Sequence, residues 1–158
     1  MRSMHSLIDT HIHLDAPEQT GSVAALLAQA RHCDITAFVV PGVRANDWQQ
    51  LLALADQQAD VFAAPGLHPA YAEQWNANAQ NQLRQCCQHP KVVAIGEIGL
   101  DGVAGPVLEK QEQVLRSQLQ IAVAANLPVL LHARKATGHL LAILRDMQIG
   151  ANIGGIWD

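Results

Sequence analysis

Two alternating patterns of apolar residues run along the chain. Continuous apolar runs of about four to eight residues are typical of strands buried in a parallel sheet. Between these runs, apolar residues recur with the spacing of one face of an α-helix. The first pattern predicts strands over residues 7–15, 35–40, 61–67, 92–100 and 128–134, with a sixth strand starting at Gly154.

The second pattern predicts a helix after each of the first five strands. Val23, Leu26 and Leu27 illustrate it, since their spacing puts all three on one side of a helix. Asn46 and Gln49 resemble a capping box, in which two side chains bond the backbone at a helix start. The apolar faces of the five predicted helices span residues 23–30, 48–55, 83–87, 108–122 and 140–147.

Five consecutive strand–helix units predict an α/β fold with a parallel sheet and helices packed against it. We expect residues 1–158 to form a single domain, because no linker rich in Pro, Gly or Ser interrupts them. A complete (β/α)₈ barrel usually takes about 250 residues and rarely fewer than about 200. The 158 residues are therefore too few to close such a barrel.

Composition excludes several classes of protein. With 49% hydrophobic residues and a net charge of −4, the chain is not disordered and has no overall basic character for binding nucleic acid. A local phosphate site is still compatible with this charge, because bound metal ions can supply positive charge that composition does not count. No apolar run approaches the ~20 residues of a membrane helix, so we expect no membrane association.

The three cysteines, Cys33, Cys86 and Cys87, are odd in number and include an adjacent pair. This arrangement does not resemble a disulfide framework. The start of the chain has no hydrophobic signal core, because Leu7 and Ile8 are followed at once by Asp9. We therefore expect reduced thiols and a cytoplasmic location.

Polar residues mark the ends of the predicted strands, where parallel α/β folds carry their chemistry. On the first strand, Asp9, His11, His13 and Asp15 alternate with apolar or uncharged residues and so share one face. Two imidazoles on one face can converge on a single metal ion. The alternative is a hydrogen-bonded structural cluster, since polar groups in an apolar strand need partners.

Glu97 follows the apolar and glycine-containing run at residues 92–96. A carboxylate buried there needs a cation or several hydrogen-bond donors, and it can bridge two metal ions. The alternative is a salt bridge to a nearby arginine. At the end of another strand, His132 follows three apolar residues and can be either a metal ligand or a hydrogen-bonded core histidine.

Two further residues can face a substrate at the same edge. Arg134 shares a face with His132, and its planar guanidinium suits bidentate contact with phosphate. Its alternative is an ion pair with Glu97 or Asp101. His68 precedes Pro69 in a predicted loop and can be either substrate-facing or a surface residue.

Four motifs occur in order along the chain, with the sequences DTHIHLD, GLHP, GEIGLD and LPVLLHAR. Together they resemble the TatD family of metal-dependent deoxyribonucleases, within the amidohydrolase superfamily. Gln111 and Gln118-Leu119 also fit the family pattern. The motifs start at residues 9, 66, 96 and 127, and the likeness extends from about Ile8 to Ile156.

The resemblance implies a (β/α)₈ barrel of the TIM type with up to two divalent metal ions, Zn, Mn or Mg, at its mouth. It implies hydrolysis of phosphodiester bonds, often in DNA, by a metal-activated water. Each role is carried over to the matching position of this sequence. His11 and His13 would hold one metal ion, Glu97 would bridge both, His132 would hold the second, and His68 and Arg134 would line the phosphate-binding mouth.

The chain departs from the family pattern near its end. The family expects Gly-Gly-Ile-Val-His in the sixth strand, with the histidine as a ligand, whereas Gly154-Gly155-Ile156 is followed here by Trp157 and Asp158. A later Glu-Thr-Asp motif, which supplies a further ligand, is not found. We therefore expect only the first five strand–helix units and the start of a sixth strand, with Asp158 at the position of the missing histidine.

Two other functions stay open. The chain can be a truncated, non-catalytic fragment that binds metal or self-associates, because an incomplete barrel has two open sheet edges. It can also be an amidohydrolase acting on a small amide or lactone, since the superfamily shares the metal constellation.

Overall fold

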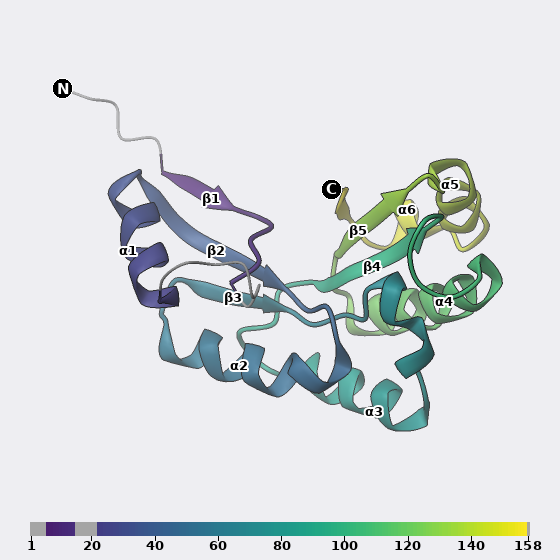
Figure 1. Cartoon of the computed structure of the whole chain (residues 1–158), viewed down its shortest axis with the longest axis horizontal. Helices are drawn as coiled ribbons and strands as arrows, with labels where there is room; N and C mark the ends of the chain where they lie inside the picture. The colour runs from purple at the N-terminus through teal and green to yellow at the C-terminus, as the bar shows by residue number, and fades with distance from the viewer. Residues whose placement is uncertain (1–5, 15–21, 158) are drawn as a thin grey trace.

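The computed structural model describes residues 6–14 and 22–157, and the strand pairs within these ranges are all parallel. The α/β fold with parallel strands is therefore confirmed (Figure 1). The strands form two three-stranded sheets with the orders β1-β2-β3 and β4-β5-β6. Their bounds are β1 Leu7–Asp9, β2 Ile35–Pro41, β3 Val61–Ala64, β4 Ile95–Asp101, β5 Val129–Arg134 and β6 Gly155–Trp157.

All five helices predicted from apolar spacing are present. They are α1 Val23–His32, α2 Trp48–Gln57, α3 Ala77–Cys86, α4 Leu108–Ala125 and α5 Thr137–Asp146. Three short helices were not predicted, because each is too short for an apolar period to be recognised. These are the 3₁₀ helices η1 Ala45–Asp47 and η2 Pro69–Gln74 and the four-residue α6 Ile149–Asn152.

A side-chain hydrogen bond marks the start of α1, whereas the cap predicted for α2 is corrected. Ser22 caps α1 by accepting a hydrogen bond from the backbone N–H of Ala25. The capping box predicted at Asn46 and Gln49 is wrong, because Asn46 lies inside η1 and the cap position of α2, Asp47, makes no side-chain cap hydrogen bond. The 3₁₀ turn already directs the chain into α2.

The predicted single sheet is divided between β3 and β4. Pro65 has no N–H to donate, and β3 ends at the residue before it. Beyond this point the N–H of Gly42 donates to the carbonyl of Gly96 at 2.8 Å, so the end of β2 approaches β4 directly. A Cβ atom at Gly66 would lie 2.7 Å from the backbone of Gly96, which shows how closely these segments pass. Glycine therefore permits the junction of the two sheets.

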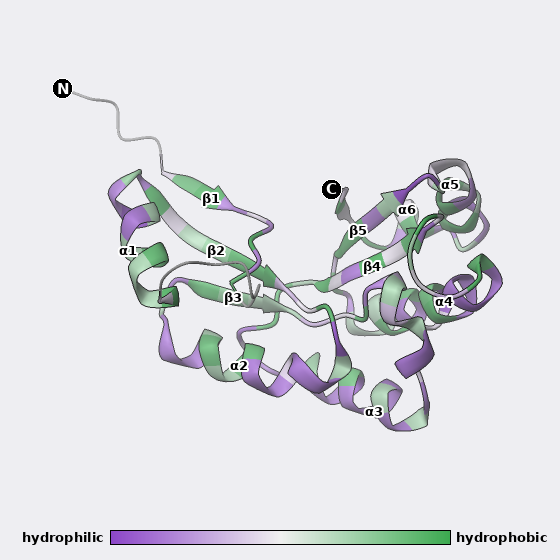
Figure 2. Cartoon of the chain, in the orientation of Figure 1, coloured by the Kyte–Doolittle hydropathy of each residue, from purple (hydrophilic) through white to green (hydrophobic). Residues whose placement is uncertain are grey.

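One hydrophobic cluster contains buried residues from both sheets and from α1 to α6. Trp48 and Phe38 are its largest fully buried side chains, and β4 is buried along its whole length. Figure 1 shows α2, α3 and α4 along one side of the strands, and Figure 2 shows hydrophilic residues along α2 and α3. Within residues 6–14 and 22–157, no helix combines the length and apolar character needed to cross a membrane.

Gly99 provides a test of the pairing between β4 and β5. A Cβ atom at Gly99 would lie 1.9 Å from the carbonyl oxygen of His132, and the φ angle of Gly99 is 154°. No rotamer change can relieve this overlap, because the opposing atom belongs to the backbone. We expect Gly99→Ala to lower the free energy of unfolding in urea by at least about 2 kcal/mol.

Gly138→Ala is the matched control. Gly138 lies in α5, and a Cβ atom there meets no atom within 4 Å. Because alanine is favoured over glycine in a helix by roughly 0.5–1 kcal/mol, this variant should unfold at an equal or higher urea concentration than the unmodified chain. Equal unfolding midpoints for the two variants would contradict the role given to Gly99.

Candidate metal centre

The segment that carries His11 and His13 is less regular than predicted. The expected strand over residues 7–15 ends at Asp9, so both histidines follow β1 instead of lying on it. The Asp9 carboxylate accepts a hydrogen bond from the N–H of His11, and the N–H of Ile12 donates to Val39 of β2. The chain therefore continues beside β2 outside a regular ladder. Asp15, predicted on the same face, lies outside the described residues.

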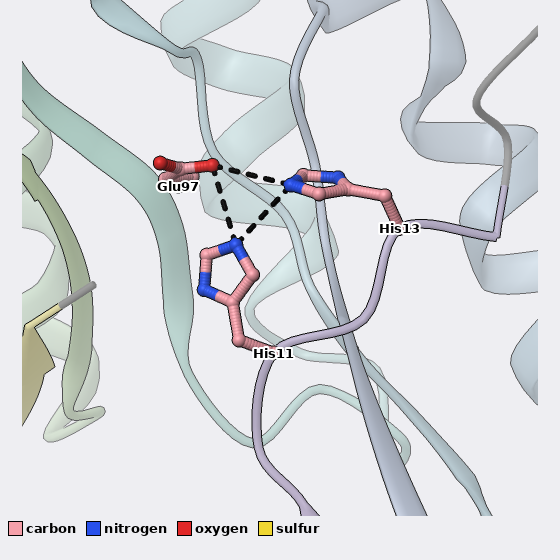
Figure 3. A group of neighbouring side chains, drawn as sticks. All are labelled: His11, His13 and Glu97. Atoms are coloured by element: carbon pink, nitrogen blue, oxygen red, sulfur yellow. Dashed lines mark hydrogen bonds and ion pairs between the residues drawn. The ribbon is translucent and has the colours of Figure 1, made fainter. Parts of the chain in front are cut away.

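His11, His13 and Glu97 converge on one point (Figure 3). The Nε2 atoms of the two histidines are 3.2 Å apart, and each lies 3.4 Å from Oε2 of Glu97. Ligand atoms at the usual bond lengths of a tetrahedral zinc ion lie roughly 3.3 Å from one another. The three side chains therefore fit a metal ion by their chemistry and by their spacing.

The second oxygen of Glu97 faces another pair of histidines. Nδ1 of His132 donates to Oε1 of Glu97 at 2.7 Å, and Nε2 of His68 lies 3.9 Å from the same oxygen. These three residues also form a group whose ligand atoms could hold an ion. The carboxylate thus lies between two histidine pairs, one at each oxygen.

Glu97 is a buried carboxylate with only 4% of its surface exposed. Burial by itself raises its pKa, but hydrogen bonds from His11, His13 and His132 hold the pKa well below its usual range. Among the described residues, the ion-pair partners of Glu97 are histidines. The alternative prediction, a salt bridge from Glu97 to an arginine, is not found in this part of the chain.

His68 is held in one orientation by its position at the start of η2. Its Nδ1 atom accepts a hydrogen bond from the N–H of Ala70 at 3.1 Å, so Nε2 is the nitrogen that faces Glu97. Burial lowers the pKa of His68 to about 4, and the ring is therefore neutral near pH 7. A neutral imidazole can accept a proton or bind an ion. Of the two predicted positions for His68, the structure has the one that faces the site.

Asp101 takes part in the site although it was not among the predicted site residues. Its Oδ2 atom lies 3.3 Å from Nε2 of His132, and its Oδ1 atom accepts hydrogen bonds from Val103 and Ala104. The hydrogen bond to Glu97 raises the pKa of His132, and the contact with Asp101 raises it further. Burial of the ring acts in the opposite direction and lowers the pKa. The alternation of strand side chains could have found Asp101, because residues 97 and 101 share a face of β4.

Arg134 lies at the end of β5, opposite Asp101 in the strand register. Its side chain is exposed, and no ion pair joins it to Glu97 or Asp101 in the described part of the chain. Lys135 follows it and is also exposed. Both cations therefore stand at the carboxyl end of the strands, near the group of histidines. Asp158, the other predicted candidate, lies outside the described residues.

Two buried glutamines of α4 fix the loops that carry the site. Gln118 accepts a hydrogen bond from the N–H of Leu67 at 2.8 Å and donates to its carbonyl at 3.1 Å, directly before His68. Gln111 bonds the N–H and the carbonyl of Asp101 in the same way, at 2.7 and 2.9 Å. Since the two glutamines are seven positions apart, they project from one face of α4. One helix therefore holds the loop after β3 and the end of β4.

The sequence model of the family described as TatD related DNase matches residues 8–156. The uncharacterized metal-dependent hydrolase YjjV of Escherichia coli (strain K12) is 38% identical over 141 residues, which cover 87% of this chain and 54% of that protein. The 3'-5' ssDNA/RNA exonuclease TatD of Pantoea ananatis (strain LMG 20103) is 31% identical over 140 residues, with the same coverage of each chain. The chain thus spans about half the length of these curated relatives.

Two solved structures share this arrangement of strands and helices. The crystal structure of the TatD homologue YjjV from E. coli K12 superposes with a TM-score of 0.84 and 36% identity, covering 90% of this chain and 56% of that one. A TatD family hydrolase from Entamoeba histolytica superposes with a TM-score of 0.79 over 95% of this chain and 56% of that one. At 21% identity, the second likeness supports the fold alone.

Gln118 provides a test of how the site is held. In Gln118→Leu the volume is nearly kept, but the buried N–H and carbonyl of Leu67 lose their partner. Each buried polar group left without a partner costs about 1–3 kcal/mol. We expect the free energy of unfolding in urea to fall by about 2 kcal/mol or more.

Gln120→Leu is the control on the same helix, because Gln120 is exposed. Its unfolding free energy should stay within about 0.5 kcal/mol of the unmodified chain. If both substitutions changed stability equally, the hydrogen bonds to Leu67 would not be what makes Gln118 important.

Proposed function

Because the chain belongs to the family of TatD related DNases, we propose that its Glu97 site takes part in metal-dependent hydrolysis of phosphodiester bonds in nucleic acid. The observation that carries this proposal is the position of Glu97 between two histidine pairs, with one carboxylate oxygen facing each. Such an arrangement suits a carboxylate that bridges two ions. It also gives the buried charge its partners.

His11, His13 and Glu97 would hold the first ion, and Glu97 with His132 would hold the second. When bound, the ions lower the pKa of a water molecule and neutralise charge on the phosphate oxygens. We propose Zn²⁺, Mn²⁺ or Mg²⁺, with imidazole favouring the first two. Nδ1 of His132 would hold an ion only in exchange for its 2.7 Å hydrogen bond to Glu97, and on this ground we propose that the second ion binds more weakly.

The remaining residues position substrate and protons. Arg134 presents its guanidinium to solvent at the mouth, where it can bind phosphate oxygens. His68 is neutral and directs Nε2 toward Glu97, so that it can accept a proton at that atom. Asp101 holds the ring of His132 through Nε2. We propose specifically that the chain acts as a deoxyribonuclease on DNA. We also propose that it is located in the cytoplasm.

The substitution Glu97→Gln tests this function. We expect the dialysed 158-residue chain to retain about one equivalent of Zn²⁺ or Mn²⁺ and to release nucleotides from single-stranded DNA when Mg²⁺, Mn²⁺ or Zn²⁺ is supplied. Glu97→Gln keeps the shape but removes the charge that both histidine pairs face. It should lower cleavage at least about 100-fold and lower metal retention in proportion.

His32→Ala is the matched control, because His32 is an exposed residue of α1. Within the described part of the chain, its hydrogen bond is to the carbonyl of Ala28 in the same helix. It should retain metal and cleavage. Retention below about 0.2 equivalents by the unmodified chain would contradict the proposed metal site. Cleavage that survives Glu97→Gln would point to a contaminating nuclease or a different site.

We also propose that this chain self-associates through the edges of its sheets. β1 and β6 are edge strands, and both expose large apolar residues. Leu7 and Ile8 are 54% and 60% exposed, and Ile156 and Trp157 are 43% and 41% exposed. Unpaired strand edges with apolar side chains favour pairing with another chain.

Light scattering at low micromolar concentration tests this association. We expect a mass above the 17.0 kDa of one chain, and Ile156→Lys should lower it by placing a charge on the β6 edge. Val107→Lys is the control, because Val107 is 69% exposed but lies before α4 and away from the edge strands. A stable monomer of the unmodified chain would contradict the proposal.

A further inference from the structure

A groove of about 420 Å³ adjoins the Glu97 site. Leu14, which directly follows His13, lines it, and so does Gly42, whose carbonyl accepts the N–H of Glu97 at 2.9 Å. The groove is therefore connected to the site through the residue after His13 and through the backbone of Glu97. Its volume lies within the roughly 300–1,000 Å³ of small-molecule sites. Its opposite wall is formed by α2.

Arg44 stands between this groove and an aromatic side chain. The guanidinium carbon lies 5.4 Å from the centre of the Tyr71 ring, which is within the range of a cation–π contact, and Arg44 also lines the groove. Nε of Arg44 bonds the Asp47 carboxylate at 3.1 Å. Tyr71 in turn meets His68 edge to face, with ring centres 6.4 Å apart. Arg44 is thus linked to His68 of the site through the ring of Tyr71.

The lining of the groove favours a flat, uncharged group over a second phosphate. Leu14, Leu51 and Leu54 supply apolar walls, and Gln50 supplies an amide that can bond a polar edge. The Asp47 carboxylate next to Arg44 opposes binding of an anion there. An arginine plane supported by an aromatic ring is a surface on which unpaired nucleobases stack.

We propose that this groove is a nucleobase subsite, with Arg44 as its stacking wall, for the nucleotide next to the bond that is cleaved. The inference rests on the proposed function, because it takes the substrate to be nucleic acid. A base enters the groove only when it is unpaired, so the subsite selects single-stranded substrate. The subsite binds through the base and does not discriminate the sugar.

The test measures binding without catalysis. A fluorescein-labelled single-stranded DNA pentamer and the same pentamer with abasic nucleotides are titrated with the 158-residue chain in EDTA, and fluorescence anisotropy is recorded. We expect the base-bearing pentamer to bind about 5- to 100-fold more tightly than the abasic one. Arg44→Ala should remove most of this difference, because the stacking wall is lost.

Arg44→Lys separates stacking from charge. Lysine keeps the positive charge but has no plane, so it should behave like Arg44→Ala. Arg84→Ala removes the same charge from an exposed position on α3 and should bind both pentamers as the unmodified chain does. Ala53→Trp places a large ring in the groove from an exposed position on α2 and should weaken binding of the base-bearing pentamer alone.

Three results would overturn the inference: no measurable binding, equal binding of the two pentamers, or full affinity in Arg44→Lys. The last would assign Arg44 to phosphate instead of a base. Cleavage is measured separately with Mn²⁺. Absence of cleavage alongside base-dependent binding would contradict the proposed function and leave the subsite supported, so the two failures are distinguishable.

Discussion

The buried carboxylate of Glu97 is the constraint on which the arrangement of this chain depends. Removing such a charge from water costs several kcal/mol unless partners surround it. The partners here are four histidines that come from three separate segments, after β1, after β3 and on β5. The ends of these segments therefore have to meet at one point beside β4. The site and the convergence of the strands are two consequences of the same electrostatic requirement.

Glycine and glutamine make that convergence possible. Close passage of backbones near Glu97 requires residues without side chains, which is why Gly42, Gly66 and Gly96 stand where β2, β3 and β4 approach one another. Close packing also leaves backbone groups at the strand ends without a ladder partner. Gln111 and Gln118 satisfy them from α4, each through both ends of its amide. The buried polar groups thus hold the histidine-bearing loops against a helix.

Apolar spacing predicted the helices and strands in their order along the chain, because both kinds of element depend on which residues can be buried. It did not predict where strands end. β1 stops at Asp9 because the Asp9 side chain bonds the next turn of backbone, and β3 stops before Pro65. The site residues were predictable as a set from their places at strand ends. Their pairing was not, since the side of Glu97 that each histidine faces depends on tertiary distances. Asp101 was missed although it shares a face of β4 with Glu97, because it was considered only as an ion-pair partner of Arg134 and its contact with His132 depends on tertiary structure.

The two oxygens of Glu97 are not equivalent, and this difference determines what each half of the site is prepared to bind. Around Oε2 the nitrogen atoms stand 3.4 Å away, a separation that suits a shared ion better than a strong hydrogen bond. Around Oε1, Nδ1 of His132 forms a 2.7 Å hydrogen bond, and Oδ2 of Asp101 lies 3.3 Å from Nε2 of the same ring. A ring nitrogen holds a metal ion only where it carries no proton, so Nδ1 of His132 would have to exchange this hydrogen bond for the ion. One carboxylate therefore faces nitrogens spaced as for a shared ion at Oε2 and a hydrogen-bonded nitrogen at Oε1.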